Sequence, residues 1–272
     1  MELIAASPCA SLDRRLLFKN VKIEPRQRVL SEAEIRAFWI ASEKLGYPYG
    51  PFYRLLLLTG VRVSELSKAQ WAEFHPELRR RLREATKAGT AVDWSAVDNG
   101  IKTWTVPRER FKSDSEHIVP LSDDACSMLA TLPHFAGCDF LFTVGNKRAI
   151  NNLPAAKLRL DAFMRAALAQ AAAINGDEPD QTKLLPPWVN HDLRRALRTN
   201  LSALDIADHI AEMTLGHGRR GLQRIYDQHR YLPQQRDAFE KWAAKLRTIA
   251  GSTPTPPADN IVALPARRKV RR

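Results

Sequence analysis

Cysteine is scarce in this chain, and the few cysteines are poorly placed for a metal centre or a disulfide framework. Only Cys9, Cys126 and Cys138 occur among 272 residues. They are odd in number, lie far apart, form no CxxC pair and have no histidine at metal-ligand spacing. We interpret them as reduced, mostly buried thiols of a cytosolic protein, and we expect neither a metal nor a cofactor.

Long apolar runs and targeting segments are also missing. The run LLLL at residues 55–58 is far shorter than a membrane span, which needs about 20 apolar residues. The opening MELIAASPCASLDRR lacks the basic-then-apolar order of a signal peptide. No internal repeat is present. These observations predict a soluble, cytoplasmic protein that does not contact a membrane.

Acidic residues are outnumbered by basic ones. The sequence holds 42 Lys and Arg against 30 Asp and Glu, which gives a net charge of +12. The hydrophobic fraction of 44% is ordinary for a folded chain, and the length suits one large or two small domains. A basic balance favours a polyanionic partner, because neutralising phosphates drives sequence-independent affinity for nucleic acid. A soluble protein that is basic for other reasons is the alternative.

Caps and apolar spacing predict a mainly helical chain. Ser31 and Glu34 form the capping-box pattern of a helix start. A second helix is expected from about residue 51 to the Thr59-Gly60 pair, and a third in SELSKAQW with Ser64 as its cap. Residues 76–100 are basic and helical in their first half and rich in turns in their second half.

One β-hairpin is predicted between these helices and the later ones. TWTVP and HIVPL read as paired strands around the polar turn ERFKSDSE, which puts Lys112 at or near a β-turn. A short strand is also expected in DFLFTV. Gly216 should end a helix and leave His217 just beyond it. The fold class expected is mainly α with a small antiparallel β-sheet (α+β), and the later helices are expected at about 123–132, 154–173, 191–203, 205–215 and 233–248.

Two motifs place cationic groups in a way that suits an anion. TGVRVSEL puts Arg62 in a turn between two helices, with Glu65 three residues later near a helix start. HDLRR puts His191 and Arg194 on one helical face, while Arg195 lies on another face and is interpreted as structural. A histidine and an arginine that point together indicate an anion site, because a metal site would need carboxylates or a second histidine.

Each of these residues also has a purely structural interpretation. Glu65 can act as a helix-dipole partner with Arg62 as its surface ion-pair mate. Asp192 can cap a solvated basic helix. Lys112, taken alone, is an ordinary turn lysine. His117, on the returning strand, is interpreted as structural or in contact with backbone.

The last motif is LGH followed by a tyrosine. Tyr226 lies nine residues after His217 (226 − 217). A lone tyrosine is usually a core or surface residue, and Tyr231 competes with Tyr226 for any chemical role. His209 and His229 are interpreted as bystanders.

Together and in order, these motifs resemble the catalytic domain of the tyrosine recombinases, the phage-integrase family. Members read roughly T-G-x-R-x-x-E, a hairpin lysine followed by V-P-L, H-x-L-R-R, L-G-H, and a tyrosine nine residues on. The chain supplies every element in order between Arg62 and Tyr226. The flanking segments RVLSEAEIRAFW and IYDQHRYLPQQRDAFEKWAAKL resemble the prophage-integrase branch, enzymes of phages and genomic islands. The fold implied is that of the tyrosine-recombinase catalytic domain.

The chain also departs from the family pattern. Phe111 and Ala196 stand where many relatives have threonine, and neither is expected to affect the chemistry. Relatives carry an N-terminal core-binding domain, whereas this chain begins at what resembles the last helix of such a domain. We expect a lead-in at 1–30, which is a remnant of the core-binding domain or a linker, and a catalytic domain at 31–250. Within the catalytic domain, residues 76–100 are expected to be an insertion. A disordered basic tail is expected at 251–272.

The resemblance implies that the protein cleaves and rejoins DNA strands by transesterification. Tyr226 would attack the scissile phosphate, which forms a 3′-phosphotyrosine and releases a 5′-hydroxyl. Arg62 and Arg194 would hold the non-bridging oxygens, and Lys112 would protonate the leaving oxygen. The implied partners are double-stranded DNA at attachment sites, a synaptic homotetramer assembled from free monomers, and a directionality factor, all at the bacterial nucleoid.

The remaining motif residues receive supporting roles from the resemblance. His191 would accept the tyrosine proton or hold a phosphate oxygen, and His217 would donate a hydrogen bond to the phosphate. Glu65 would orient Arg62. Two other functions stay open: a catalytically silent, DNA-binding remnant of an integrase, and relaxation of supercoils as in type IB topoisomerases.

Overall fold

A computed structural model of the chain describes residues 27–111, 116–174, 184–217 and 230–251. The described residues are mostly helical with two short antiparallel strand pairs, which confirms the expected fold class. The helices are α2 (Glu32–Leu45), α3 (Tyr49–Thr59), α4 (Val63–Ser67), α5 (Pro76–Ala88), α6 (Asp123–Ala130), α7 (Leu153–Ile174), α8 (His191–Ala203), α9 (Asp208–Thr214) and α11 (Leu232–Ala250). The strands are β1 (Thr103–Val106), β2 (His117–Pro120), β3 (Thr143–Val144) and β4 (Arg148–Ala149), and single 3-10 turns cover Trp71–Glu73, Trp94–Ala96 and Arg108–Arg110.

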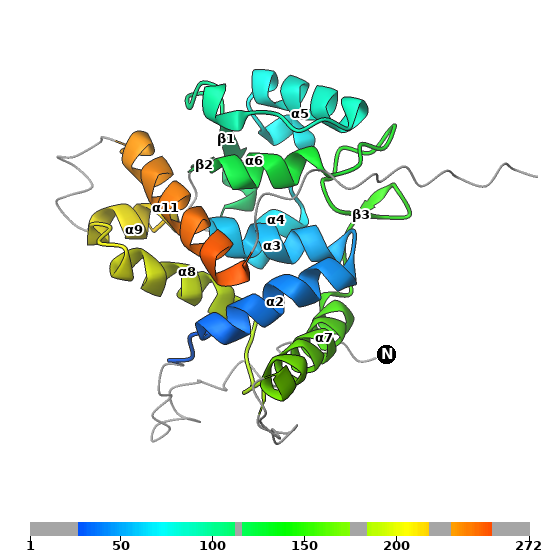
Figure 1. Ribbon diagram of the computed structural model, residues 1–272. Helices are drawn as coiled ribbons and strands as arrows, with labels where there is room; N and C mark the ends of the chain where they lie inside the picture. The colour runs from blue at the N-terminus through cyan, green and yellow to red at the C-terminus, as the bar shows by residue number, and fades with distance from the viewer. Residues whose placement is uncertain (1–26, 112–115, 175–183, 218–229, 252–272) are drawn as a thin grey trace, which may run out of the picture.

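Helix α3 is the central element of the fold. All four leucines of the run at 55–58 are buried, as are Phe52 and Tyr53. A helix that is apolar on every side needs neighbours all round it. Figure 1 shows α3 and α4 between α2 and α7 on one side, α5, α6 and the β1–β2 hairpin on another, and α8, α9 and α11 on a third.

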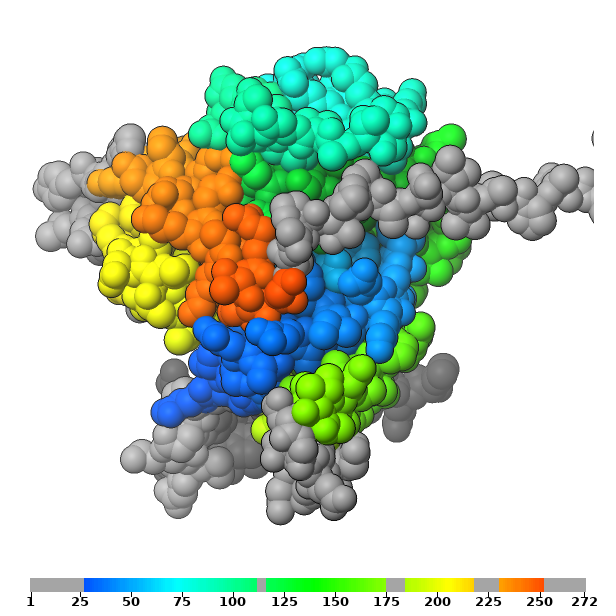
Figure 2. Space-filling view, viewed as in Figure 1, coloured from blue at the N-terminus to red at the C-terminus, as the bar shows by residue number. Residues whose placement is uncertain are grey.

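The last described helix ties these groups together. The Trp242 indole of α11 donates to the Leu57 carbonyl of α3 at 2.8 Å. Arg36 of α2 donates through Nε to the Ile249 carbonyl at 2.7 Å. Figure 2 shows α11 lying against α2, with residues 76–100 forming the upper edge of the molecule. In the described part of the chain, every helix is too short or too polar to cross a bilayer.

The predicted caps of α2 and α3 are confirmed, but that of the third helix is wrong. Ser31 and Glu34 form a reciprocal capping box, with hydrogen bonds of 2.7 and 3.3 Å. Gly60 ends α3 in the left-handed conformation. Helix α4 begins at Val63 with Arg62 as its N-cap residue, because the Glu65 carboxylate accepts the Arg62 backbone N–H at 2.9 Å. Ser64 is therefore already inside the helix.

Residues 76–100 fold as the sequence indicates, with α5 first and turns afterwards. Leu78 and Leu82 of α5 are fully buried, and the helix packs against α6. Lys102, which follows this segment, is buried and donates through Nζ to the Trp94 carbonyl at 2.6 Å and to Asp123 at 2.8 Å. The segment is thus anchored to the protein. That it is an insertion stays a prediction.

The β1–β2 hairpin is confirmed, with Val106 opposite His117 and Thr103 opposite Pro120. The short strand expected in DFLFTV is present as β3, paired with β4. Lys112 lies outside the described residues, so its place in the turn stays a prediction.

Candidate active site

The turn after α3 builds the first wall of the site. Gly60 has φ 62°, and a Cβ atom there would lie 3.1 Å from Leu215 and 3.3 Å from Leu197. Both the backbone conformation and the close approach therefore favour glycine. The turn leads directly into Arg62 at the start of α4.

Arg62 is held by an ion pair and an aromatic ring. Its Nη1 donates to Oε1 of Glu65 at 2.7 Å, and its backbone N–H donates to the other carboxylate oxygen. Glu65 is buried, whereas a quarter of the Arg62 side chain remains exposed. The Arg62 guanidinium lies 5.3 Å from the centre of the Phe111 ring. Glu65 thus holds both the backbone and the side chain of Arg62, which leaves most of the guanidinium N–H groups turned outward.

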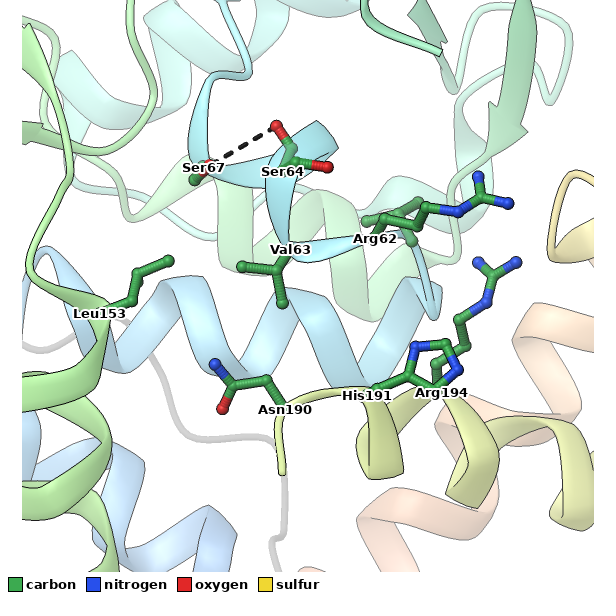
Figure 3. Close-up of a pocket in the computed structure, with 9 residues that line it drawn as sticks. Arg62, Val63, Ser64, Ser67, Leu153, Asn190, His191 and Arg194 are labelled. Atoms are coloured by element: carbon green, nitrogen blue, oxygen red, sulfur yellow. Dashed lines mark hydrogen bonds between the residues drawn. The ribbon is translucent and has the colours of Figure 1, made fainter. Parts of the chain in front are cut away.

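Helix α8 supplies the second wall. His191 is its first residue, and Arg194 lies one turn later. The fully buried Asp192 accepts the Val189 backbone N–H at 2.9 Å and Arg195 Nη1 at 2.6 Å. Arg195 thus has the structural role expected of it, whereas the expected cap by Asp192 is wrong: Asn190 is the N-cap residue and has no side-chain cap hydrogen bond. The His191–Arg194 face of the helix lies on the cleft side (Figure 3).

Arg194 is a buried cation whose described partners are not carboxylates. Its Nη1 donates to the Gly60 carbonyl at 2.6 Å, and Nη2 contacts both the Leu215 carbonyl and, at 3.0 Å, Nε2 of His217. These bonds use three of the five guanidinium N–H groups, so within the described ranges two have no partner. Burial, with a smaller effect of Arg62, lowers the pKa of Arg194 to about 10. The side chain is therefore charged at neutral pH.

The end of α9 places His217 next to Arg194. The Gly216 N–H donates to the Met213 carbonyl at 2.8 Å, and the His217 N–H donates to the Glu212 carbonyl at 3.0 Å. This pair of bonds, with Gly216 at φ 67°, is a Schellman motif. The predicted helix end at Gly216 is confirmed. Any Cβ at Gly216 would lie 2.6 Å from Phe111, so glycine is also required for space.

His117 lies close enough to Arg194 and Arg62 for their charges to act on it. Its ring is buried and stacks on Phe111 at 4.9 Å with an interplanar angle of 24°. Burial first, and then the charges of Arg194 and Arg62, lower the pKa of His117 to about 4, and a hydrogen bond with the Thr214 backbone opposes them. His117 is therefore neutral at physiological pH. The expected contact with backbone is present as the hydrogen bond with Thr214, and the structure adds the contact of His117 with the site.

The walls enclose a cleft of about 470 Å³. Figure 3 shows the guanidinium groups of Arg62 and Arg194 on the same side, with the His191 ring beside Arg194. Burial, followed by the charges of Arg195 and Arg194, lowers the pKa of His191, which favours a neutral ring able to accept a proton. In the described residues no group of three or more His, Cys, Asp or Glu side chains is placed to hold a metal ion. The other lining residues are Val61, Val63, Ser64, Ser67, Leu153 and Asn190.

The structure thus brings most of the predicted site residues to one place. Arg62, Glu65, His191, Arg194 and His217 come from α4, α8 and the end of α9. Lys112 and Tyr226 lie outside the described residues, and their positions stay predictions.

Sequence reasoning missed three residues of this site. Phe111 was expected to have no bearing on the chemistry, but its ring contacts Arg62 and His117. The sequence could have indicated Phe111 and His117, because they lie on either side of the hairpin lysine. Glu212 accepts from Nδ1 of His217 at 2.5 Å, and nothing in its local sequence distinguishes it from a surface residue of α9.

Two arginines and His191 at one cleft, with His217 bonded to Arg194, form a site for a polyvalent oxyanion such as phosphate. The sequence profile of the Phage integrase family matches residues 28–232, and the chain belongs to this family. This confirms the resemblance that the motifs indicate.

Two relatives with assigned names are similar to the chain. It is 26% identical over 189 residues to prophage integrase IntA of Escherichia coli strain K12, which covers 69% of the chain and 41% of that relative. It is 25% identical over 258 residues to prophage integrase IntZ of the same strain, which covers 94% of the chain and 53% of that relative. The chain therefore spans about half the length of these relatives.

Proposed function

We propose that this protein is a site-specific DNA recombinase that cleaves and rejoins strands through a 3′-phosphotyrosine, in phage or genomic-island integration and excision. The observation that carries the proposal is the convergence of Arg62, Arg194 and His191 at one cleft of a phage-integrase family chain, with His217 bonded to Arg194. The chain is 26% and 25% identical to the two relatives, so the assignment of the reaction depends on the geometry of the site.

The arginines supply the charge that the transferring phosphate needs. In the pentacoordinate state the non-bridging oxygens carry more charge than in the ground state, so donors already fixed in position favour that state. Arg194 is fixed by two backbone carbonyls and Arg62 by Glu65. The planar guanidinium matches two phosphate oxygens at once, which an ammonium group does not.

Tyr226 is the proposed nucleophile. Its phenolic oxygen forms a bond to phosphorus while the bond from phosphorus to the 5′-oxygen breaks. The tyrosine proton passes to His191, whose lowered pKa keeps it in the accepting form. Lys112 donates a proton to the leaving 5′-oxygen. The phosphotyrosine retains the bond energy, so rejoining by another strand's 5′-hydroxyl requires no nucleotide cofactor.

The proposed partner is duplex DNA at attachment sites. The net charge of +12 supports a phosphate-rich partner. Strand exchange between two sites needs four cleavages, so we propose that free monomers assemble into a homotetramer at synapsis. We also propose a directionality factor as a partner. The proposed setting is the bacterial nucleoid.

A suicide-substrate assay tests the proposal. Duplexes nicked next to the scissile position release a short fragment on cleavage, so the covalent adduct accumulates and is seen as a shifted band on a denaturing gel. The DNA would carry the end of a tRNA gene, because enzymes of the prophage-integrase branch often insert at such genes. We expect an adduct with the native chain and none with Tyr226→Phe. The affinity of Tyr226→Phe for DNA should stay within a few-fold of the native value. Tyr231→Phe is the matched control and should keep the adduct.

Other results would point to the alternatives. An adduct with Tyr226→Phe and none with Tyr231→Phe would move the nucleophile to Tyr231. DNA binding without any adduct would identify a silent remnant. Relaxation of supercoiled plasmid by the isolated chain would favour topoisomerase-like activity over recombination.

A further inference from the structure

Both ring nitrogens of His217 have a partner, and the partners define the tautomer. Nδ1 lies 2.5 Å from Oε2 of Glu212, and Nε2 lies 3.0 Å from Nη2 of Arg194. A guanidinium has only donors, so Nε2 must accept. The ring proton is therefore on Nδ1 and is donated to the Glu212 carboxylate.

Glu212 is itself held in place. Its other oxygen, Oε1, accepts Nε of Arg198 at 2.7 Å. Arg198 also pairs with Asp208 and donates to Ser202 at 2.7 Å, so the carboxylate is fixed between α8 and α9. Partial burial acts to raise the pKa of Glu212, but hydrogen bonds from Arg198 and His217 outweigh it and lower the pKa. Glu212 is therefore ionised at neutral pH.

This arrangement has a consequence when a phosphate enters the cleft. A neutral ring with its proton on Nδ1 offers only a lone pair at Nε2, which phosphate oxygens repel. To donate to phosphate, Nε2 must take up a proton, and the ring becomes an imidazolium. Among the described residues, the ionisable groups facing His217 are Arg194 from α8, His117 from β2 and Glu212 from α9. Only Glu212 is negative, so it is the group that favours the charged ring.

We propose that Glu212 is a positioning residue of this site. It orients the His217 ring through Nδ1 and supplies the counter-charge that allows Nε2 to take a proton from solvent and donate it to the scissile phosphate as a hydrogen bond. The proposal rests on the proposed function, since it assigns His217 to a phosphate in this cleft. It extends the site by a residue that does not touch DNA and acts through another side chain.

The test compares three variants. Glu212→Gln keeps a hydrogen-bond acceptor for Nδ1 but loses the charge, and Glu212→Ala loses both. Asp208→Asn is the matched control, because it removes a carboxylate from the same Arg198 network without touching His217. The readouts are the pH dependence of adduct formation on the suicide duplex and the ¹⁵N shifts of the His217 ring in the DNA-free protein.

The expected results separate charge from position. Adduct formation should fall off at a lower pH in Glu212→Gln than in the native chain, because the variant lacks the negative charge that favours a charged His217 ring. Glu212→Ala should be slower at least tenfold at every pH, and its Nδ1 shift should move because the Nδ1–H loses its carboxylate acceptor. Asp208→Asn should match the native chain within about twofold.

Two outcomes would overturn the proposal: a native pH profile in Glu212→Gln, or an Nδ1 shift and adduct rate in Glu212→Ala that both match the native chain. The nitrogen shifts do not depend on catalysis. If the native chain forms no adduct, the proposed function fails, and the shift of His217 on adding duplex DNA, native against Glu212→Gln, still decides the role of Glu212. If Glu212→Ala does not fold, Glu212→Gln carries the comparison.

Discussion

Helix α5 and the cleft both carry arginines, and they balance the charge of those arginines in opposite ways. On α5, Arg80 lies between Glu77 and Glu84 of the same helix, at 2.7 and 2.6 Å. These side chains are exposed, and the partners stand three and four residues apart. In the cleft, Arg194 is buried, and its described partners are two carbonyls and a histidine from distant parts of the chain.

This difference determines what each arginine can do. A guanidinium neutralised by carboxylates along its own helix presents little charge to a ligand, and water and salt screen it further. A buried guanidinium held by neutral carbonyls keeps its charge, in surroundings where charge interactions are stronger than in water. The partner of an arginine therefore indicates an anion site better than the number of arginines does.

The largest effect is expected from Arg194→Ala. Removing one donor that stabilises transition-state charge should slow adduct formation on the order of 10²–10³-fold. The Gly60 and Leu215 carbonyls also lose their donor, and each buried unsatisfied group costs about 1–3 kcal/mol. Single-turnover cleavage and urea unfolding measure the two effects. Loss of stability with a native cleavage rate would show that Arg194 is only structural.

A smaller effect, on stability, is expected at His117. Its pKa in the fold, about 4, lies below the ordinary value of 6.5, so the unfolded chain binds a proton that the folded chain does not. Stability should therefore be full above pH 6.5 and fall as the pH drops towards 4, by about 3 kcal/mol at most.

His117→Phe keeps the stacked ring and removes the titration, so its unfolding free energy should depend less on pH over this range. The half-buried His134 also has a pKa lowered to about 4 by burial, but it is present in both proteins and cancels in the difference. Parallel curves of unfolding free energy against pH for the two proteins would refute the assignment.

The smallest effect is expected from Arg80→Ala on α5. Its charge is already balanced by Glu77 and Glu84, so adduct formation should stay within about twofold of native, in contrast to the loss expected for a donor in the site. The same suicide duplex measures it beside Arg194→Ala. A tenfold loss in Arg80→Ala would place α5 in the DNA-contacting surface and remove the contrast between the two regions.

Much of the local structure is predictable because its causes are local. The capping box at Ser31 and the glycines at 60 and 216 mark the helix ends, and period-two alternation marks the β1–β2 hairpin. The start of α4 was misplaced because both Ser64 and Glu65 fit a helix N-terminus. The Glu65 carboxylate accepts the Arg62 N–H, so Arg62 is the N-cap residue and the helix begins at Val63.

Sequence by itself determined the fold class and pointed to five side chains that lie together in the structure, because each belongs to a short motif and the motifs in order resemble one family. Only the tertiary structure decided what holds them. The Gly60 carbonyl that fixes Arg194 is 134 residues away from it, and the Phe111 ring reaches Arg62 from the segment beside the hairpin. Such contacts depend on how the elements pack around α3, and packing across that distance leaves no periodic trace in the sequence.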